Sequence, residues 1–171
     1  FTFKGTFTYA KNKILVTGDA VPRYEYQSRV GQPASSILGY VAEGLFIDEA
    51  EIAKSPSQIF LGSSKPGDIK YRDVNKDGKI DDFDRIYIGN PTVPIISYGF
   101  GSSVKYKGFD LSFLFQGASK VSFIAAPKAF GEVNRGNVFT IMRDNRWEPE
   151  TQNLNASFPR LGVGPQNNNY V

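Results

Sequence analysis

The sequence contains no cysteine and no histidine among its 171 residues. The first absence excludes a disulfide framework and a thiolate metal site, and the second removes the commonest general base and zinc ligand. A glycan hydrolase would still need two carboxylates facing each other across a cleft, and nothing in the sequence places Asp48 and Glu51 in that way. We therefore expect no enzymatic activity from this chain.

Long apolar runs and concentrated positive charge are also missing. No stretch reaches the roughly eighteen apolar residues of a transmembrane helix, although a transmembrane β-strand would leave a much weaker trace. Lysine and arginine number 20 against 17 acidic residues and are scattered, so no nucleic-acid partner is expected. The chain begins at Phe1 without a leader segment, and we expect it to be processed or cut from a longer protein.

Strict alternation of residue type predicts the first strand. In F-T-F-K-G-T-F-T-Y, aromatic residues or glycine occupy the odd positions, and threonine or lysine occupies the even ones. Side chains alternate between the two faces of a β-strand, so this segment would have one aromatic face. We predict a strand near residues 1–10.

The stretch S-Y-G-F-G-S-S-V-K-Y-K-G-F-D-L-S-F-L-F-Q-G predicts a β-hairpin. Its strands are expected near residues 97–106 and 109–116, on either side of a tight turn at Lys107-Gly108. Each strand has an aromatic-rich face and a small or polar face. The predicted fold class is all-β, with antiparallel strands.

Long connections separate these strands. Residues 18–95 and 117–171 hold most of the proline, asparagine, aspartate and serine, with one short helix predicted at 48–53, before Ser55-Pro56. Connections of this length indicate that the strands belong to a larger scaffold. Two interpretations remain: a soluble β-sandwich with an aromatic core, and an outer-membrane barrel with aromatic residues facing lipid and polar ones facing water.

The stretch D-V-N-K-D-G-K-I-D-D-F-D, residues 73–84, crowds aspartates that repel one another unless a cation or hydrogen-bond donors neutralise them. It fits the calcium-loop template, with Gly78 at the sharp turn, and ends in aspartate as dockerin-type loops do. The alternative is a turn whose Asp and Asn side chains cap backbone N–H groups. We predict a structural calcium site whose ligands are Asp73, Asn75, Asp77, Lys79 through its carbonyl, and Asp84.

Two arginines in the last third of the chain could bind an anionic substrate. For Arg146 and Arg160 we instead expect ion pairs with Asp144 or Glu148, or hydrogen bonds to backbone carbonyls. We assign neither arginine to a substrate site.

The run P-G-D-I-K-Y-R-D-V-N-K-D-G-K-I-D-D-F-D-R-I-Y-I-G-N-P and the hairpin sequence after it resemble the C-terminal barrel region of SusC/RagA-type TonB-linked outer-membrane transporters. Upstream, G-Q-P-A-S-S-I-L-G-Y and E-G-L-F match the same family. Downstream, N-R-W-E-P-E-T-Q-N and F-P-R-L match it as well. The resemblance covers nearly the whole chain.

This resemblance implies that residues 1–171 are part of one outer-membrane β-barrel domain of about 22 strands, with long extracellular loops. It also implies a parent protein that imports glycans, peptides or other large nutrients. A SusD-like surface lipoprotein would be its partner, and TonB would supply energy through an N-terminal region outside this chain. The alternative is a soluble cell-surface binding module with a dockerin-like calcium loop.

Overall fold

The computed structural model describes residues 1–58, 62–124, 132–133 and 138–163. The chain divides into two compact units, each described here by itself. The first comprises Phe1–Ile37 and Tyr87–Ile124, and the second comprises Leu38–Ile86 and Ala125–Val171. Within the described ranges, no helix is both long enough and apolar enough to cross a bilayer.

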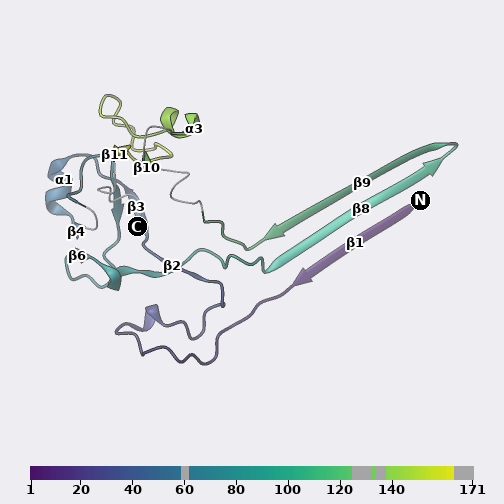
Figure 1. Ribbon diagram of the computed structural model, residues 1–171, viewed down its shortest axis with the longest axis horizontal. Helices are drawn as coiled ribbons and strands as arrows, with labels where there is room; N and C mark the ends of the chain where they lie inside the picture. Colours follow the sequence, from purple (N-terminus) through teal and green to yellow (C-terminus); the bar gives the residue numbers. More distant parts are fainter. Residues whose placement is uncertain (59–61, 125–131, 134–137, 164–171) are drawn as a thin grey trace. The chain divides into compact units, whose positions relative to one another are not determined.

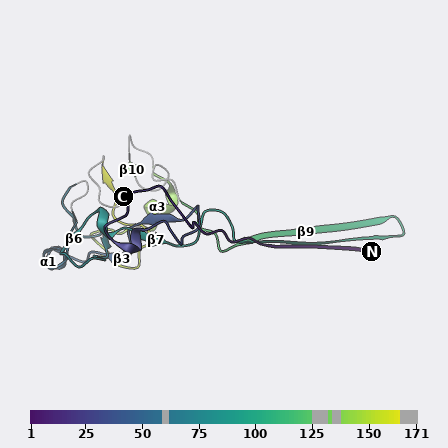
Figure 2. The ribbon, with the colours of Figure 1, turned by 90° about the horizontal axis from the view of Figure 1, so that it is seen from below.

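The first unit is built on a three-stranded antiparallel sheet with the order β1-β8-β9. Its strands are β1 (Thr2–Tyr9), β8 (Ile96–Tyr106) and β9 (Phe109–Ser119), and Figure 1 shows β8 between the other two. Figure 2 shows the same strands as a single thin layer. The predicted all-β fold with antiparallel strands is confirmed.

A two-residue turn joins β8 to β9. Lys107 and Gly108 have φ angles of 45° and 87°, so both central residues adopt the positive-φ conformation of a type I′ turn. This turn matches the right-handed twist of the strands on either side. The hairpin turn predicted at Lys107-Gly108 is confirmed.

The second unit consists of short elements. Strand β3 (Ala42–Leu45) pairs antiparallel with β5 (Ile69–Tyr71), and a bulge lies between Ala42 and Gly44. The remaining pairs are β4 (Ser57–Gln58) with β6 (Lys79–Ile80) and β10 (Glu132–Val133) with β11 (Gly162–Val163), both parallel. The other elements in the described ranges are η1 (Glu25–Gln27), β2 (Ile37–Gly39) paired with β7 (Ile86–Ile88), α1 (Glu49–Lys54), η2 (Asp82–Asp84) and α3 (Thr140–Asp144).

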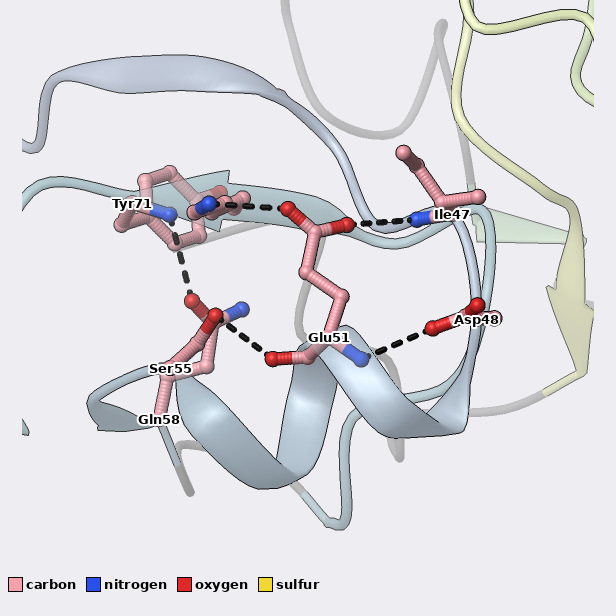
Figure 3. Close-up of polar contacts among 7 residues, drawn as sticks. Ile47, Asp48, Glu51, Ser55, Gln58 and Tyr71 are labelled. Carbon is pink, nitrogen blue, oxygen red and sulfur yellow. Dashed lines mark hydrogen bonds and ion pairs between the residues drawn. The ribbon is translucent and has the colours of Figure 1, made fainter.

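Helix α1 forms where its capping residues predict it. The Asp48 carboxylate accepts a hydrogen bond from the Glu51 N–H at 2.7 Å, and Ser55 ends the helix in extended conformation. Figure 3 shows the Glu51 carboxylate reaching back to the N–H of Ile47, at 2.8 Å. The predicted short helix is confirmed, displaced by one residue.

The core of the second unit joins residues from distant parts of the sequence. Phe46 and Met142 are each only 1% exposed, and Trp147 is 5% exposed. Phe46 follows β3, whereas Met142 lies in α3 and Trp147 lies shortly after it. Both long connections of the chain therefore contribute buried apolar side chains to the second unit.

Candidate functional site

The register of the sheet in the first unit separates its side chains into two chemically different faces. Residues directly opposite in neighbouring strands point to the same side, and the pairing runs without a bulge through β1, β8 and β9. One side, here called the apolar face, carries Phe3, Phe7, Tyr9, Ile96, Tyr98, Phe100, Val104, Tyr106, Phe109, Leu111, Phe113 and Phe115, with Ser102 and Ser119 as polar exceptions. The opposite, polar face carries Thr2, Lys4, Thr6, Thr8, Ser97, Gly99, Gly101, Ser103, Lys105, Asp110, Ser112 and Gln116, with Leu114 and Ala118 as apolar exceptions.

Most of the apolar face is exposed. Even in the middle of the strands, Phe100 is 44%, Phe113 is 46% and Phe115 is 57% exposed. An exposed apolar patch that continues across three strands is unusual for a water-facing protein surface and indicates contact with lipid or another apolar partner.

Aromatic contacts stabilise this face internally. Phe100 and Phe115 are direct cross-strand partners, and their rings stack with centroids 5.1 Å apart. The Tyr98 ring lies over Gly117, where a Cβ atom would come within 2.3 Å of the ring. Glycine at position 117 therefore gives the tyrosine a flat surface on which to pack.

The acidic loop is held by its own side chains. The Asp73 carboxylate accepts hydrogen bonds from the N–H groups of Lys76 (2.6 Å) and Gly78 (2.8 Å). Asn75 Oδ1 accepts from the Asp77 N–H at 3.0 Å, and Asp77 Oδ1 accepts from the Lys79 N–H at 3.0 Å. These are the capping bonds of the Asx-turn interpretation, and the side-chain oxygens of template positions 1, 3 and 5 accept them.

Asp84, at template position 12, has a different environment. It is 0% exposed, and its Oδ1 accepts from the N–H groups of Val74 (2.8 Å) and Asn75 (3.3 Å). Its Oδ2 accepts from the Asp81 N–H at 2.8 Å, which completes a capping box at η2. Three N–H donors occupy most of the roughly four acceptor positions of the carboxylate.

The loop fits a calcium ion in part. A carboxylate that accepts two hydrogen bonds, or an amide oxygen that accepts one, keeps free lone pairs, so Asp73, Asn75 and Asp77 can still act as oxygen ligands. Gly78 has the φ of 82° that the sharp turn requires. Asp84 would have to share its oxygens with backbone donors. Within the part of the chain that the structure describes, no three His, Cys, Asp or Glu side chains form a metal-binding group. The five-residue calcium site stays a prediction.

The Tyr40 side chain connects the end of this loop to its neighbours. The Tyr40 hydroxyl donates a hydrogen bond to Asp82 Oδ1 at 3.4 Å, and the Tyr40 ring packs at a tilt on Tyr71. Burial, with a smaller contribution from Asp82, raises the pKa of Tyr40 to about 12. Tyr40 therefore remains a protonated donor throughout the physiological range.

Glu51 connects α1 to β5. Its carboxylate accepts from the Ile47 N–H and forms an ion pair with Lys70 at 2.9 Å. The hydrogen bond from Ile47, and then Lys70, lower the pKa of Glu51 from its ordinary value. Gln58, at the end of β4, adds a further link to β5, because its amide group donates to the Ile69 carbonyl. The same amide accepts a hydrogen bond from the Tyr71 N–H (Figure 3).

The two arginines singled out in the sequence differ in their partners. Arg146 pairs with Glu148 at 2.6 Å, as predicted. The prediction for Arg160 is wrong, because Arg160 pairs with Asp68, which is 0% exposed. Asp68 and Arg160 lie 92 positions apart, and no local pattern in the sequence indicates that they meet.

Comparison with known proteins connects these features to one kind of protein. The chain aligns with the TonB-dependent receptor P3 of Formosa agariphila at 27% identity over 180 positions, covering 95% of this chain. The TonB-dependent receptor P26 of the same organism aligns at 35% identity over 112 positions, covering 61% of this chain. The chain is similar to TonB-dependent receptors.

The similarity concerns a limited part of these receptors. The chain spans 17% of the length of the P3 receptor and 11% of that of the P26 receptor. No protein-family model matches the chain.

Proposed function

We propose that β1, β8 and β9 are wall strands of the outer-membrane β-barrel of a TonB-dependent receptor. The observation that carries this proposal is the exposed apolar face, which continues in register across all three strands opposite a face of small and polar residues. A barrel wall faces lipid on its outside and water on its inside, so its outward side chains are apolar and its inward side chains are small or polar. The similarity to two TonB-dependent receptors supports the same conclusion.

The dimensions of the hairpin support a membrane-spanning role. Strands β8 and β9 have 11 residues each, and a transmembrane β-strand needs about 9–11. Tyr98 lies near one end of β8 and Tyr106 at the other, with Phe100 and Val104 between them, which matches aromatic girdles at two membrane interfaces.

The connections at the two ends of the sheet favour one orientation. The Lys107-Gly108 turn closes one end, whereas the long connections leave from the end at which Tyr9, Ile96 and Ser119 lie in register. Outer-membrane barrels have short periplasmic turns and longer extracellular loops. In this proposal, residues 10–95 and 120–171 lie outside the cell.

The activity proposed for the protein that carries this chain is TonB-driven uptake of oligosaccharides, peptides or other large nutrients. Its motifs resemble those of SusC/RagA-type transporters, and on that basis we include a SusD-like surface lipoprotein as partner of the extracellular loops. Copurification tests whether the two proteins bind each other. We expect it to be lost when residues 40–86 are deleted, in a variant that still inserts into the membrane. Retained copurification after the deletion would contradict binding through this loop.

Calcium is proposed as a structural ligand of the acidic loop, bound by oxygens of Asp73, Asn75, Asp77 and the Lys79 carbonyl. Asp84 would hold the loop through the hydrogen bonds that it accepts from backbone N–H groups. When bound, the ion would offset the mutual repulsion of the carboxylates. Thermal melts in calcium and in chelator test this, since a ligand present at about 100 times its Kd stabilises the folded state by about 2.7 kcal/mol. Equal melting temperatures in both conditions would contradict calcium binding.

Single-cysteine labelling tests the barrel wall, because this chain contributes no native thiol. A small fluorophore would be attached to Leu111→Cys or to its neighbour Ser112→Cys, in the complete protein reconstituted in vesicles. Brominated acyl chains are expected to quench the label at position 111 on the apolar face and not the label at position 112 on the polar face. Equal quenching at both positions would refute the proposed orientation of the sheet, and quenching at neither would favour a soluble binding module.

A further inference from the structure

Three sequence motifs that lie far apart in the chain meet in the second unit. Gly67 and Asp68 belong to the P-G-D motif, Trp147 belongs to N-R-W-E-P, and Arg160 belongs to F-P-R-L. The first motif is in the connection between β1 and β8, and the other two follow β9. These four residues, here called the clasp, form contacts that the calcium loop and the sheet do not use.

An ion pair forms the polar half of the clasp. Asp68 is 0% exposed, and Arg160 Nη2 donates a hydrogen bond to its Oδ2 at 3.0 Å. Arg160 Nε lies 2.6 Å from Oδ1, as an ionic contact without hydrogen-bond geometry. The N–H of Lys65 donates to Oδ2 at 2.8 Å, so the buried carboxylate has both a cation and a backbone donor.

Close packing forms the apolar half. Gly67 has a φ of 84°, and a Cβ atom at this position would lie 2.2 Å from Trp147 Cε3. The indole ring therefore lies directly against the backbone of the turn, and Trp147 itself is 5% exposed. Only glycine permits both this backbone conformation and this contact.

Backbone hydrogen bonds connect the two halves. The Gly67 N–H donates to the Phe46 carbonyl at 2.8 Å, and the Phe46 N–H donates to the Asp68 carbonyl at 2.9 Å. The Arg160 N–H donates to the Gly67 carbonyl at 3.0 Å, and the Trp147 N–H donates to the Phe158 carbonyl at 2.9 Å. The backbone of Gly67 therefore bonds to both connections, to Phe46 in one and to Arg160 in the other.

We propose that the clasp joins the two long connections into one cooperative loop body, so that neither opens without the other. Both connections leave the same end of the sheet, where Tyr9, Ile96 and Ser119 are in register. Opening either connection at the clasp removes Arg160 from Asp68 and leaves a buried carboxylate without its cation, which is strongly unfavourable. This proposal rests on the geometry of the second unit and not on the transport function.

Native-state hydrogen exchange tests the proposal in the complete protein that carries this chain. In the wild type, the amides of Phe46, Gly67, Trp147 and Arg160 are expected to share one opening equilibrium and to respond equally to added denaturant. Separate openings with different denaturant dependence would overturn the proposal. This measurement requires no variant to fold.

Variants provide the second part of the test. Arg160→Lys keeps the charge but loses the paired geometry of the guanidinium, and we expect exchange at least tenfold faster at both Gly67 and Trp147. The control is Arg72→Lys, which alters an exposed ion pair with Glu43 in the same unit, and it is expected to leave both amides unchanged. Acceleration by Arg160→Lys confined to residues 158–163 would overturn the proposal.

Discussion

Replacing Gly67 with alanine tests whether the packing of the Trp147 ring requires a residue without a side chain at position 67. Two penalties act at this position. The first is the φ of 84°, at which a Cβ atom costs about 1–2 kcal/mol. The second is steric, because the new methyl group would lie 2.2 to 2.9 Å from three atoms of the indole ring. The ring belongs to a buried core residue, so it has to leave its position or the turn has to open.

The size of the steric term follows from the burial of Trp147. A tryptophan side chain buries about 150–250 Å², which at about 25 cal/mol per Å² corresponds to about 4–6 kcal/mol when the ring is fully expelled. Partial relaxation of the neighbours lowers this value. We expect Gly67→Ala to destabilise the second unit by about 3–5 kcal/mol more than the backbone penalty alone, as for removal of a buried aromatic side chain.

Gly78→Ala is the matched control for this experiment. Gly78 has nearly the same φ, 82°, and nothing lies within 4 Å of the Cβ position. Trp147 is the only tryptophan of this sequence, so in the complete protein in detergent the emission that is lost in Trp147→Phe reports on the clasp. Gly67→Ala should shift the emission to longer wavelength and lower the urea midpoint, whereas Gly78→Ala, in chelator, should show only the small backbone effect. Equal effects of the two variants would refute the packing assigned to Trp147.

Three further predictions concern the loop, the helix and the sheet. Asp77→Ala should abolish the calcium-dependent rise in melting temperature and accelerate hydrogen exchange over residues 65–90 but not over 97–116; equal effects on both regions would count against it. The pKa of Glu51 in the folded state is lowered from 4.5. The ionised carboxylate therefore stabilises the folded state above that pH, and this contribution is lost as the pH falls through the folded-state pKa. The urea midpoints of wild type and Glu51→Gln should converge on acidification. Phe113→Lys on the apolar face should destabilise the barrel in lipid by about 2–4 kcal/mol and Ser112→Lys by much less, as measured by urea titration in vesicles; equal losses would contradict the assignment of faces.

Local signals in the sequence predict the elements that depend on local chemistry. The alternation around Phe113 and the glycine at position 108 are sufficient for the hairpin, because strand period and turn geometry are properties of adjacent residues. Asp48 predicts the start of α1 in the same way. The contact between Asp68 and Arg160 was not predicted, because it depends on how two long connections fold together and each residue has nearer partners of opposite charge.

The apolar face shows a different limit of sequence reasoning. The alternating pattern of the strands fits both a sandwich core and a lipid-facing wall, since the core of a sandwich and the interior of a bilayer are both apolar. The structure adds the register, which aligns Phe7 with Tyr98 and Phe100 with Phe115 on one continuous and exposed surface. That continuity, together with the similarity to TonB-dependent receptors, favours the membrane interpretation.

Two carboxylates among the described residues of the second unit, Asp68 and Asp84, are fully buried and are stabilised in different ways, which bears on the role of calcium. Asp68 has a guanidinium partner, whereas Asp84 is held by three backbone N–H groups. The backbone donors to Asp73, Asp77 and Asp84 stabilise the acidic loop in addition to any cation that it would bind. The effect of calcium on the melt should follow the ratio of calcium concentration to Kd. A loop that unfolds completely in chelator would show that these hydrogen bonds are too weak to form it alone.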